Sequence, residues 1–347
     1  MTAGATNSLV DVAGLRVGHA QRVGDGYRTG TTVVLAPPGG MVAGVDVRGA
    51  APGTRETELL DPRNLVERVH AIVLTGGSAY GLSAACGVME RLADAGIGFP
   101  VEGGVVPIVP AAVIYDLGRG GAFRAVPDGT LGAEAYDAAA GSHGPDPWAS
   151  GSVGAGTGAV AGGLAGGIGT ASVVLPSGVT VAAMAVVNAV GSVLDPAGGR
   201  LSGTRYGLPG EFDHLREPLE EEVAAWQGAT VTSFNTTIGV VATDLTLTKA
   251  QCGKLAGVAH DGLARAIRPA HTMVDGDTVF GLSTCALPFP EPPEEVVGAG
   301  RNAPGAAGLH DVLAAGADVF SRAVAHAMLA ATGREGAPAY RDVFPSA

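Results

Sequence analysis

The sequence is poor in the features that mark several large classes of protein. Of its 347 residues, only 16% are charged and 5% are aromatic. Acidic residues outnumber basic ones, 33 to 21, for a formal net charge of −12, and there is no run of Lys or Arg. Binding to nucleic acid or to an anionic membrane needs a clustered basic surface. We therefore expect neither nucleic acid nor a membrane as a partner.

Long hydrophobic runs are also absent. No segment reaches 18 apolar residues without a glycine or polar interruption, which argues against a transmembrane helix. The start, MTAGATNSLVDVAG, lacks the basic stretch followed by an apolar one that is typical of a secretory signal. We expect a cytoplasmic protein.

Cysteine and histidine give no metal-binding pattern. Cys86, Cys252 and Cys285 are odd in number and far apart, so neither a disulfide framework nor a CxxC pair is visible, and we expect reduced thiols in the core. The eight histidines form no HxH, no HExxH and no Cys/His pair at ligand spacing. The sequence therefore predicts no metal site.

Glycine, by contrast, is abundant, with 56 residues, and small residues favour closely packed layers. Short β-branched runs bounded by Gly and Pro predict strands at 31–36, 42–47, 71–75, 172–175, 179–187 and 238–243. Apolar residues at helical spacing predict helices from Ser78 to Gly96, from the capping box Thr248–Gln251 to Pro269, and over 307–331. The Pro/Gly-rich stretches 139–151 and 286–305 are predicted to be surface connections within one layered α/β domain, 1–347.

One glycine-rich segment matches a cofactor-binding pattern only by its letters. Gly154-Ala-Gly156-Thr-Gly158-Ala159 fits G-x-G-x-x-A, but a dinucleotide loop needs a hydrophobic strand directly before it, and Pro145-Asp-Pro-Trp-Ala-Ser-Gly stands there. Tight backbone packing explains the segment better, and we expect no cofactor. Dinucleotide binding is kept as the least favoured alternative function.

A polar segment stands at the mouth of a buried strand, Asn235-Thr236-Thr237 before Ile238-Gly-Val-Val-Ala-Thr243. On local pattern alone, this is a turn entering a strand. In the chemical interpretation, the Thr236 hydroxyl attacks the preceding carbonyl by an N→O shift, and hydrolysis of the ester leaves Thr236 as a new amino terminus. An α-amino group has a pKa of about 7.7–8.0, so its neutral fraction can take the hydroxyl proton.

Two carboxylates follow in Asp275-Gly276-Asp277. Considered alone, this pattern is typical of turn residues that are exposed to solvent. If the two carboxylates face the Thr236 ammonium instead, one carboxylate can orient the ammonium group. The other can change how readily that group gives up a proton. A metal interpretation lacks a third ligand.

Together, these segments resemble the P1 family of peptidases, the group of D-aminopeptidase/esterase, β-peptidyl aminopeptidase and nylon-oligomer hydrolase enzymes. The similarity spans nearly the whole chain. It runs in order through Val45–Gly49, Leu74–Gly81, Ala112–Asp116, Gly154–Gly158, Val186–Gly191, Asn235–Thr237 and Asp275–Thr278.

The resemblance implies an αββα sandwich of the N-terminal-nucleophile hydrolase kind, with two β-sheets between helical layers. It also implies self-cleavage into an α chain, 1–235, and a β chain, 236–347, in a homo-oligomer of four or more subunits. Thr236 matches the nucleophile and Asn235 the residue before the cut. Asp275 and Asp277 match the groups that hold the nucleophile, Asn188 the amide that donates to the oxyanion, and Tyr115 the tyrosine on the substrate-amine side.

The sequence departs from the family at one position. Several relatives have a lysine at about the position of Gly163, and this chain has Gly162-Gly163-Leu164-Ala165. Any role of that lysine, in maturation or in binding a substrate carboxylate, is therefore in doubt.

The predicted function is that of an autoprocessed aminopeptidase or amidase acting on small peptides, amides or esters. Two alternatives stay open. One is an endo-type hydrolase of ω-amino acid oligomers, and the other is an uncleaved small-molecule-binding protein that has kept the scaffold.

Overall fold

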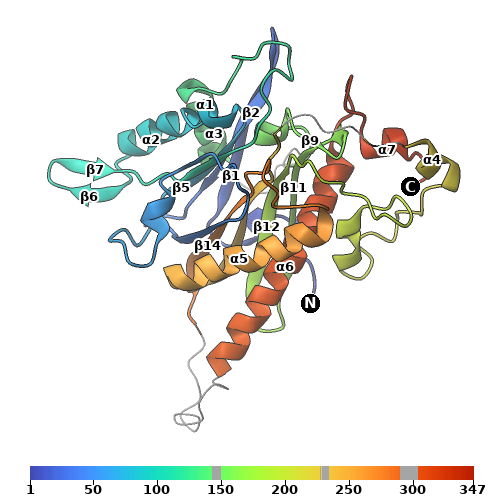
Figure 1. The fold of residues 1–347 in the computed structure, drawn as a ribbon. Helices are drawn as coiled ribbons and strands as arrows, with labels where there is room; N and C mark the ends of the chain where they lie inside the picture. Colours follow the sequence, from blue (N-terminus) through green and yellow to red (C-terminus); the bar gives the residue numbers. More distant parts are fainter. Residues whose placement is uncertain (143–149, 227, 229–233, 290–303) are drawn as a thin grey trace.

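The protein consists of two central β-sheets enclosed by helices on both outer faces (Figure 1). The structure is a computed structural model that describes residues 1–142, 150–226, 228, 234–289 and 304–347, with the backbone alone for 304–307. The predicted connections at 139–151 and 286–305 therefore lie largely outside the described residues.

The first sheet has the strand order β1-β2-β5-β8-β4. Its strands are β1 (Arg16–Gly24), β2 (Tyr27–Leu35), β4 (Thr54–Arg55), β5 (Ala71–Thr75) and β8 (Ala111–Val113). β5 and β8 run parallel, and the other neighbours are antiparallel. An exposed hairpin, β6 (Phe99–Val101) with β7 (Gly104–Val106), projects beside this sheet (Figure 1).

The second sheet has the order β11-β12-β13-β14-β3. Its strands are β3 (Val42–Val47), β11 (Gly167–Val174), β12 (Thr180–Val187), β13 (Ile238–Leu245) and β14 (Thr278–Leu287). β13 is the central strand, and it runs antiparallel to β12 but parallel to β14. A small hairpin, β9 (Val160–Ala161) with β10 (Leu164–Ala165), leads into β11.

Helices cover the outer face of each sheet. α1 (Ser78–Gly81), α2 (Ala84–Asp94) and α3 (Gly129–Gly141) lie on the side of the first sheet, and α5 (Lys249–Ala266) and α6 (Pro304–Ala330) cross the second (Figure 1). Shorter elements are α4 (Glu220–Ala225), α7 (Tyr340–Val343) and the 3-10 turns Leu9–Asp11, Thr57–Leu60, Gly154–Gly156 and Ser202–Tyr206.

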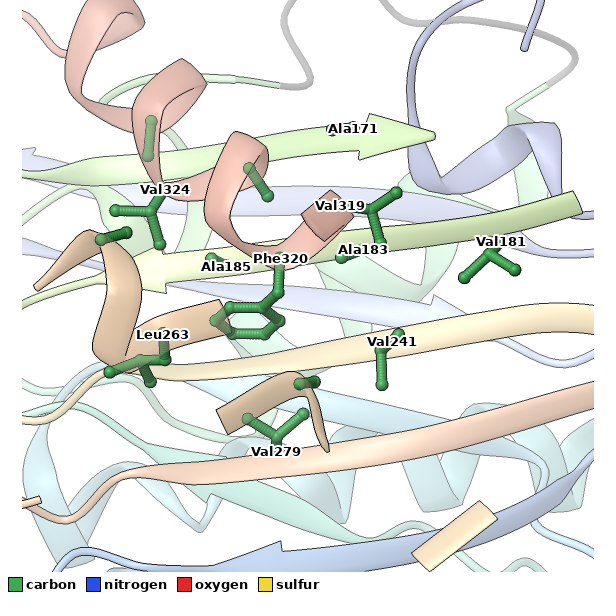
Figure 2. Packing of buried hydrophobic residues seen from close by; sticks show 14 of the residues in the cluster. Ala171, Val181, Ala183, Ala185, Val241, Leu263, Val279, Val319, Phe320 and Val324 are labelled. Carbon is green, nitrogen blue, oxygen red and sulfur yellow. The ribbon is translucent and has the colours of Figure 1, made fainter. Parts of the chain in front are cut away.

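Three apolar clusters fill the spaces between these layers. Val34 and Ile72 meet Met184 and Val240 between the two sheets, while Val33 and Val73 face the helices on the other side of the first sheet. Figure 2 shows the outer face of the second sheet, where Phe320 and Val324 of α6 point onto the strands. Strands β12 and β13 are buried along their whole length because both of their faces are covered. The predicted αββα layering is confirmed.

Most of the predicted elements are present. The strands at 42–47 and 71–75 have the predicted bounds, and the Thr248–Gln251 capping box opens α5, with the Gln251 N–H donating to Thr248 Oγ1. The helix predicted after Ser78 is divided into α1 and α2. Strand β1 and helix α3 were not predicted.

Two expectations about composition need comment. Only Cys252 is a core thiol, since Cys86 is exposed and Cys285 is partly exposed, so the expectation of three core thiols is wrong. Within α6, Gly308–Ala330 is long and apolar enough to cross a membrane, but 72% of its most apolar stretch is buried inside the protein. Its hydrophobicity is explained by packing on α5 and the second sheet.

Candidate active site

The predicted site residues meet at one edge of the second sheet because of its topology. β13 and β14 are parallel, so their starts share an edge, with Thr236 two residues before β13 and Asp277 directly before β14. β12 is antiparallel to β13, which brings Asn188, the residue after β12, to the same edge. β3 ends there too and brings Gly49. Residues from four separate segments of the sequence thus become neighbours.

Thr236 is buried at this edge, and its backbone N–H donates to the carbonyl oxygen of Asn188 at 2.6 Å. Its hydroxyl lies against the Asp275–Asp277 turn. A Cβ placed on Gly276 would be 2.9 Å from Thr236 Oγ1 and 2.6 Å from Ala51 O. Only glycine at position 276 therefore leaves room for the hydroxyl in this position.

Asp277 holds the residue that follows the candidate nucleophile. Its Oδ1 accepts a hydrogen bond from Thr237 N at 2.7 Å, and its Oδ2 accepts from His271 N at 3.1 Å and His271 Nδ1 at 2.8 Å. The side chain is 3% exposed, so the carboxylate is satisfied by protein donors. It fixes the start of β13 directly beside Thr236.

Asp275 lies on the other side of the same turn. Its Oδ2 accepts from Thr272 N and Thr272 Oγ1, and its backbone forms a β-bridge with Asn235. Burial raises the pKa of this carboxyl, and the negative charge of Asp277 adds to that shift against the Thr272 hydrogen bonds. Asp275 is therefore more easily protonated than an ordinary exposed aspartate.

Asn188 is fully buried and has several partners. Its Nδ2 donates to the Tyr115 carbonyl oxygen at 3.2 Å, and its Oδ1 accepts from Val160 N at 3.0 Å and from Arg119 Nη1. The amide group predicted to face an oxyanion is thus also a structural link to the other sheet. The Tyr115 ring lies 6.1 Å from the Phe234 ring, just before the predicted cut.

Arg119 is a site residue that sequence reasoning missed. One guanidinium nitrogen, Nη1, donates to Asn188 Oδ1 and to Gly158 O, and the other, Nη2, donates to Asn235 Oδ1 at 2.8 Å. It lies four residues after Tyr115, beyond the Ala112–Asp116 segment that carries the family resemblance, and no local pattern marks it. Burial lowers its pKa, while the nearby Asp116 opposes that shift.

His271 was also missed as a partner of Asp277. Its ring packs edge-on against His260, with the two centroids 4.8 Å apart. Burial lowers the pKa of His260 to about 4, so that ring is neutral at pH 7, and its Nε2–H donates to Asp46 O. Two packed histidine rings therefore lie next to the Asp277 carboxylate, with His271 in contact with it and His260 against His271.

At Gly163 the structure gives a reason for the departure from the family. Gly162 and Gly163 form the two-residue turn between β9 and β10, with φ of +55° and +92°. Two-residue hairpin turns favour glycine because both central residues take positive φ. A tight turn thus occupies position 163, and Arg119 supplies a cation beside Asn235 in this chain.

No group of three or more His, Cys, Asp or Glu side chains that could hold a metal ion occurs within the described part of the chain. The site residues instead supply a hydroxyl, two carboxylates, an amide and a guanidinium.

Comparison with known proteins decides the family. The profile of peptidase family S58 matches residues 7–340. The chain belongs to peptidase family S58. A Mycobacterium tuberculosis (strain ATCC 25618 / H37Rv) protein named as an uncharacterized aminopeptidase is 52% identical over 98% of this chain and 99% of its own length. The 6-aminohexanoate-oligomer endohydrolase of Kocuria sp. (strain KY2) is 31% identical over 82% of this chain and 76% of its own length.

Solved structures of two aminopeptidases share the fold. A Burkholderia sp. β-aminopeptidase superimposes with a TM-score of 0.70, covering 99% of this chain and 94% of its own, at 23% sequence identity. The L-aminopeptidase D-Ala-esterase/amidase of Ochrobactrum anthropi, described as a variant of the Ntn hydrolase fold, gives 0.68 at 22% identity, covering 95% and 88%. The predictions of family, fold and hydrolase function are therefore confirmed.

Proposed function

We propose that this S58 hydrolase cleaves its own Asn235–Thr236 bond and then acts as an aminopeptidase with Thr236 as the nucleophile. The observation that carries the proposal is the position of Thr236. It lies buried at the start of the central strand, with its N–H on Asn188 O, its hydroxyl against Gly276, and Asp277 fixing the next residue. Because Thr236 is already held in place, its hydroxyl loses little further conformational freedom when it attacks a carbonyl carbon.

Maturation would begin with attack of Thr236 Oγ1 on the Asn235 carbonyl carbon. The new C–O bond forms, the C–N bond breaks, and the hydroxyl proton passes to the departing amine, which leaves an ester. Water then hydrolyses that ester, giving a carboxyl group on Asn235 and a free hydroxyl and amine on Thr236.

In turnover, the free amine of Thr236 serves as the base for its own hydroxyl. An α-amino group with a pKa of about 7.7–8.0 has an appreciable neutral fraction near pH 7. Asn188 O, which already accepts from this nitrogen at 2.6 Å, would orient its lone pair toward the hydroxyl. The substrate acyl group is transferred to Oγ1, the leaving amine takes the proton, and water releases the acyl group.

Asn188 and Asp275 have supporting roles in this proposal. The Asn188 amide nitrogen, which donates to Tyr115 O in the structure, would donate to the oxyanion, and such a donor is typically worth roughly 2.7–4 kcal/mol. Asp275 and Asp277 would hold the ammonium form of Thr236 between turnovers.

A second candidate function is endo-type cleavage of amide oligomers, the activity named for the Kocuria sp. relative. One observation favours it: Phe234 is 53% exposed beside the Tyr115 ring, so the site admits a residue on the amino side of the acyl position. Assaying an N-acetylated oligomer beside its free-amine counterpart separates the two functions. Hydrolysis of the blocked oligomer alone would contradict the aminopeptidase proposal.

The remaining alternative is an uncleaved binding protein, and mass spectrometry distinguishes it from a processed enzyme. We also propose a homo-oligomer of four or more subunits, to be tested by light scattering of the purified protein. A monomeric mass would contradict that proposal without affecting the catalytic one.

A further inference from the structure

Asn235, the residue before the proposed cut, takes the place of a substrate acyl group in the uncleaved chain. In the proposed function, Thr236 Oγ1 attacks the Asn235 carbonyl once during maturation and the substrate carbonyl in every later turnover. The two carbonyls must therefore occupy the same place. It follows that the side chain of Asn235 occupies the space that the side chain of a substrate's amino-terminal residue enters later, a space we call the acyl subsite.

The acyl subsite is closed and polar on the side that the Asn235 side chain faces. Asn235 is 5% exposed, its backbone N–H donates to Val274 O at 3.3 Å, and its Oδ1 accepts from Arg119 Nη2 at 2.8 Å. A guanidinium group has only donors, so it can be satisfied only by an oxygen at this position. An aliphatic side chain there would leave Nη2 without this partner.

Arg119 meets only neutral acceptors in the structure. These are Gly158 O, Asn188 Oδ1 and Asn235 Oδ1; the nearby Asp116 carboxylate attracts the guanidinium electrostatically but is not among its hydrogen-bond acceptors in the part of the chain that the structure describes. A second guanidinium, that of Arg334, adds positive charge by donating to Gly158 O and Ala159 O. Burial lowers the pKa of Arg334 to about 10, with the charge of Arg119 contributing to the shift, so Arg334 is a cation at pH 7. Arginine side chains stay protonated in proteins, so Arg119 is treated as a cation as well.

From this arrangement we propose that Arg119 makes the enzyme selective for substrates whose amino-terminal residue carries a carboxylate or carboxamide, with aspartyl substrates preferred over asparaginyl and both over alanyl or leucyl. The inference rests on the proposed function. Its physical basis is that an oxygen at the position of Asn235 Oδ1 keeps the hydrogen bond from the guanidinium, and that a carboxylate oxygen there adds an ion pair to this bond. Such bonds are roughly twice as strong as neutral ones.

The test compares kcat/KM of the processed wild-type enzyme on aspartyl, asparaginyl, alanyl and leucyl p-nitroanilides. We expect the aspartyl substrate to exceed the alanyl one by at least about tenfold, the effect of one hydrogen bond to a charged group. Equal or faster hydrolysis of the alanyl or leucyl substrate overturns the inference and leaves the proposed function intact. Hydrolysis of none of the four counts against the proposed function itself.

Variants separate selectivity from a structural role. Arg119→Met is expected to lower kcat/KM for the aspartyl substrate at least about tenfold more than for the alanyl one, which removes the aspartyl preference, and Arg119→Lys to restore part of it. The matched control is Arg124→Met, which removes an exposed arginine that stacks on Tyr80 and is expected to keep the wild-type ratio. A uniform loss on all substrates in Arg119→Met would show that the residue is only structural, contrary to the inference.

Arg119 also contacts the residue before the cut, so its variants can fail to mature. In that case product inhibition of the wild-type enzyme replaces them, with free L-aspartate expected to inhibit at least about tenfold more tightly than L-alanine. Equal inhibition constants would overturn the inference.

Discussion

Replacing Asp277 by Asn tests whether the start of β13 must be held for the chain to cut itself. The carboxylate accepts three hydrogen bonds, from Thr237 N, His271 N and His271 Nδ1. An asparagine has one acceptor oxygen and one donor nitrogen, so its NH₂ group must face either Thr237 N–H or the His271 donors. In both orientations at least one buried hydrogen bond to a charged acceptor is lost.

The size of the effect follows from that count. A hydrogen bond to a charged group is worth about 1.5–3 kcal/mol, and about 1.4 kcal/mol corresponds to a factor of ten. If the bond to Thr237 N orients the scissile region in the transition state, Asp277→Asn is expected to slow maturation by about 10- to 150-fold. The assay is intact mass spectrometry of freshly purified precursor at successive times.

A matched control separates this effect from a general loss of stability. Asp244, at the far end of the same strand, is also buried and accepts a backbone hydrogen bond, from Thr180 N at 2.9 Å. Asp244→Asn is expected to mature at the wild-type rate. Wild-type maturation of Asp277→Asn, or equal slowing of both variants, would refute the reasoning.

Two further predictions concern stability and packing. Burial raises the pKa of Glu211, but hydrogen bonds from His326 and Arg322 outweigh it and lower the pKa well below its usual range. This stabilisation is present above the ordinary pKa near 4.5 and is lost as the pH falls below it. Glu211→Gln should therefore lower the free energy of unfolding by about 3–5 kcal/mol at pH 7, measured by urea titration, and by less at pH 3.5. An equal loss at the two pH values would contradict this prediction. A Cβ on Gly49 would lie 2.2 Å from Asp277 N and 2.5 Å from Asp275 O, so Gly49→Ala should block maturation in a folded chain. The control is Gly253→Ala on α5, where an added Cβ has open space and maturation should proceed. Full processing of Gly49→Ala, seen by gel electrophoresis, would be the contrary result.

The sequence predicted those elements whose local pattern matches their environment. The strands at 42–47 and 71–75 are short β-branched runs; the second is buried along its whole length and the first over its first three residues. β1 was missed because it is an edge strand with polar residues such as His19, Gln21 and Arg22 along it. α3 was missed because its residues are mostly Ala and Gly, which give no wide apolar stripe.

The helix α3 is nevertheless well packed, for a reason that local pattern does not reveal. A Cβ on Gly132 would lie 1.9 Å from Ala84 O, so the glycine lets α3 approach α2 closely. Such an approach depends on tertiary contact between helices rather than on the residues of one helix.

The candidate site was predictable as a set of residues but not as a geometry. The chemistry of Asn235-Thr236 and of Asp275-Gly276-Asp277 could be read from the residue types, and their assembly depends on the parallel pairing of β13 with β14. Arg119 could not be found in this way, because its hydrogen bonds to Asn188 and Asn235 span 69 and 116 residues of sequence. Its importance is visible only when the two sheets are packed together.

The central claim is that Thr236 is the nucleophile for its own release, and intact mass spectrometry tests it most directly. Wild-type protein is expected to separate, under denaturing conditions, into polypeptides of residues 1–235 and 236–347. Thr236→Ala should remain a single 34.2 kDa chain, while Thr236→Ser, which keeps a hydroxyl, should still be cut. A wild-type protein that stays full length, or a Thr236→Ala variant that is cut at the same bond, would contradict the account.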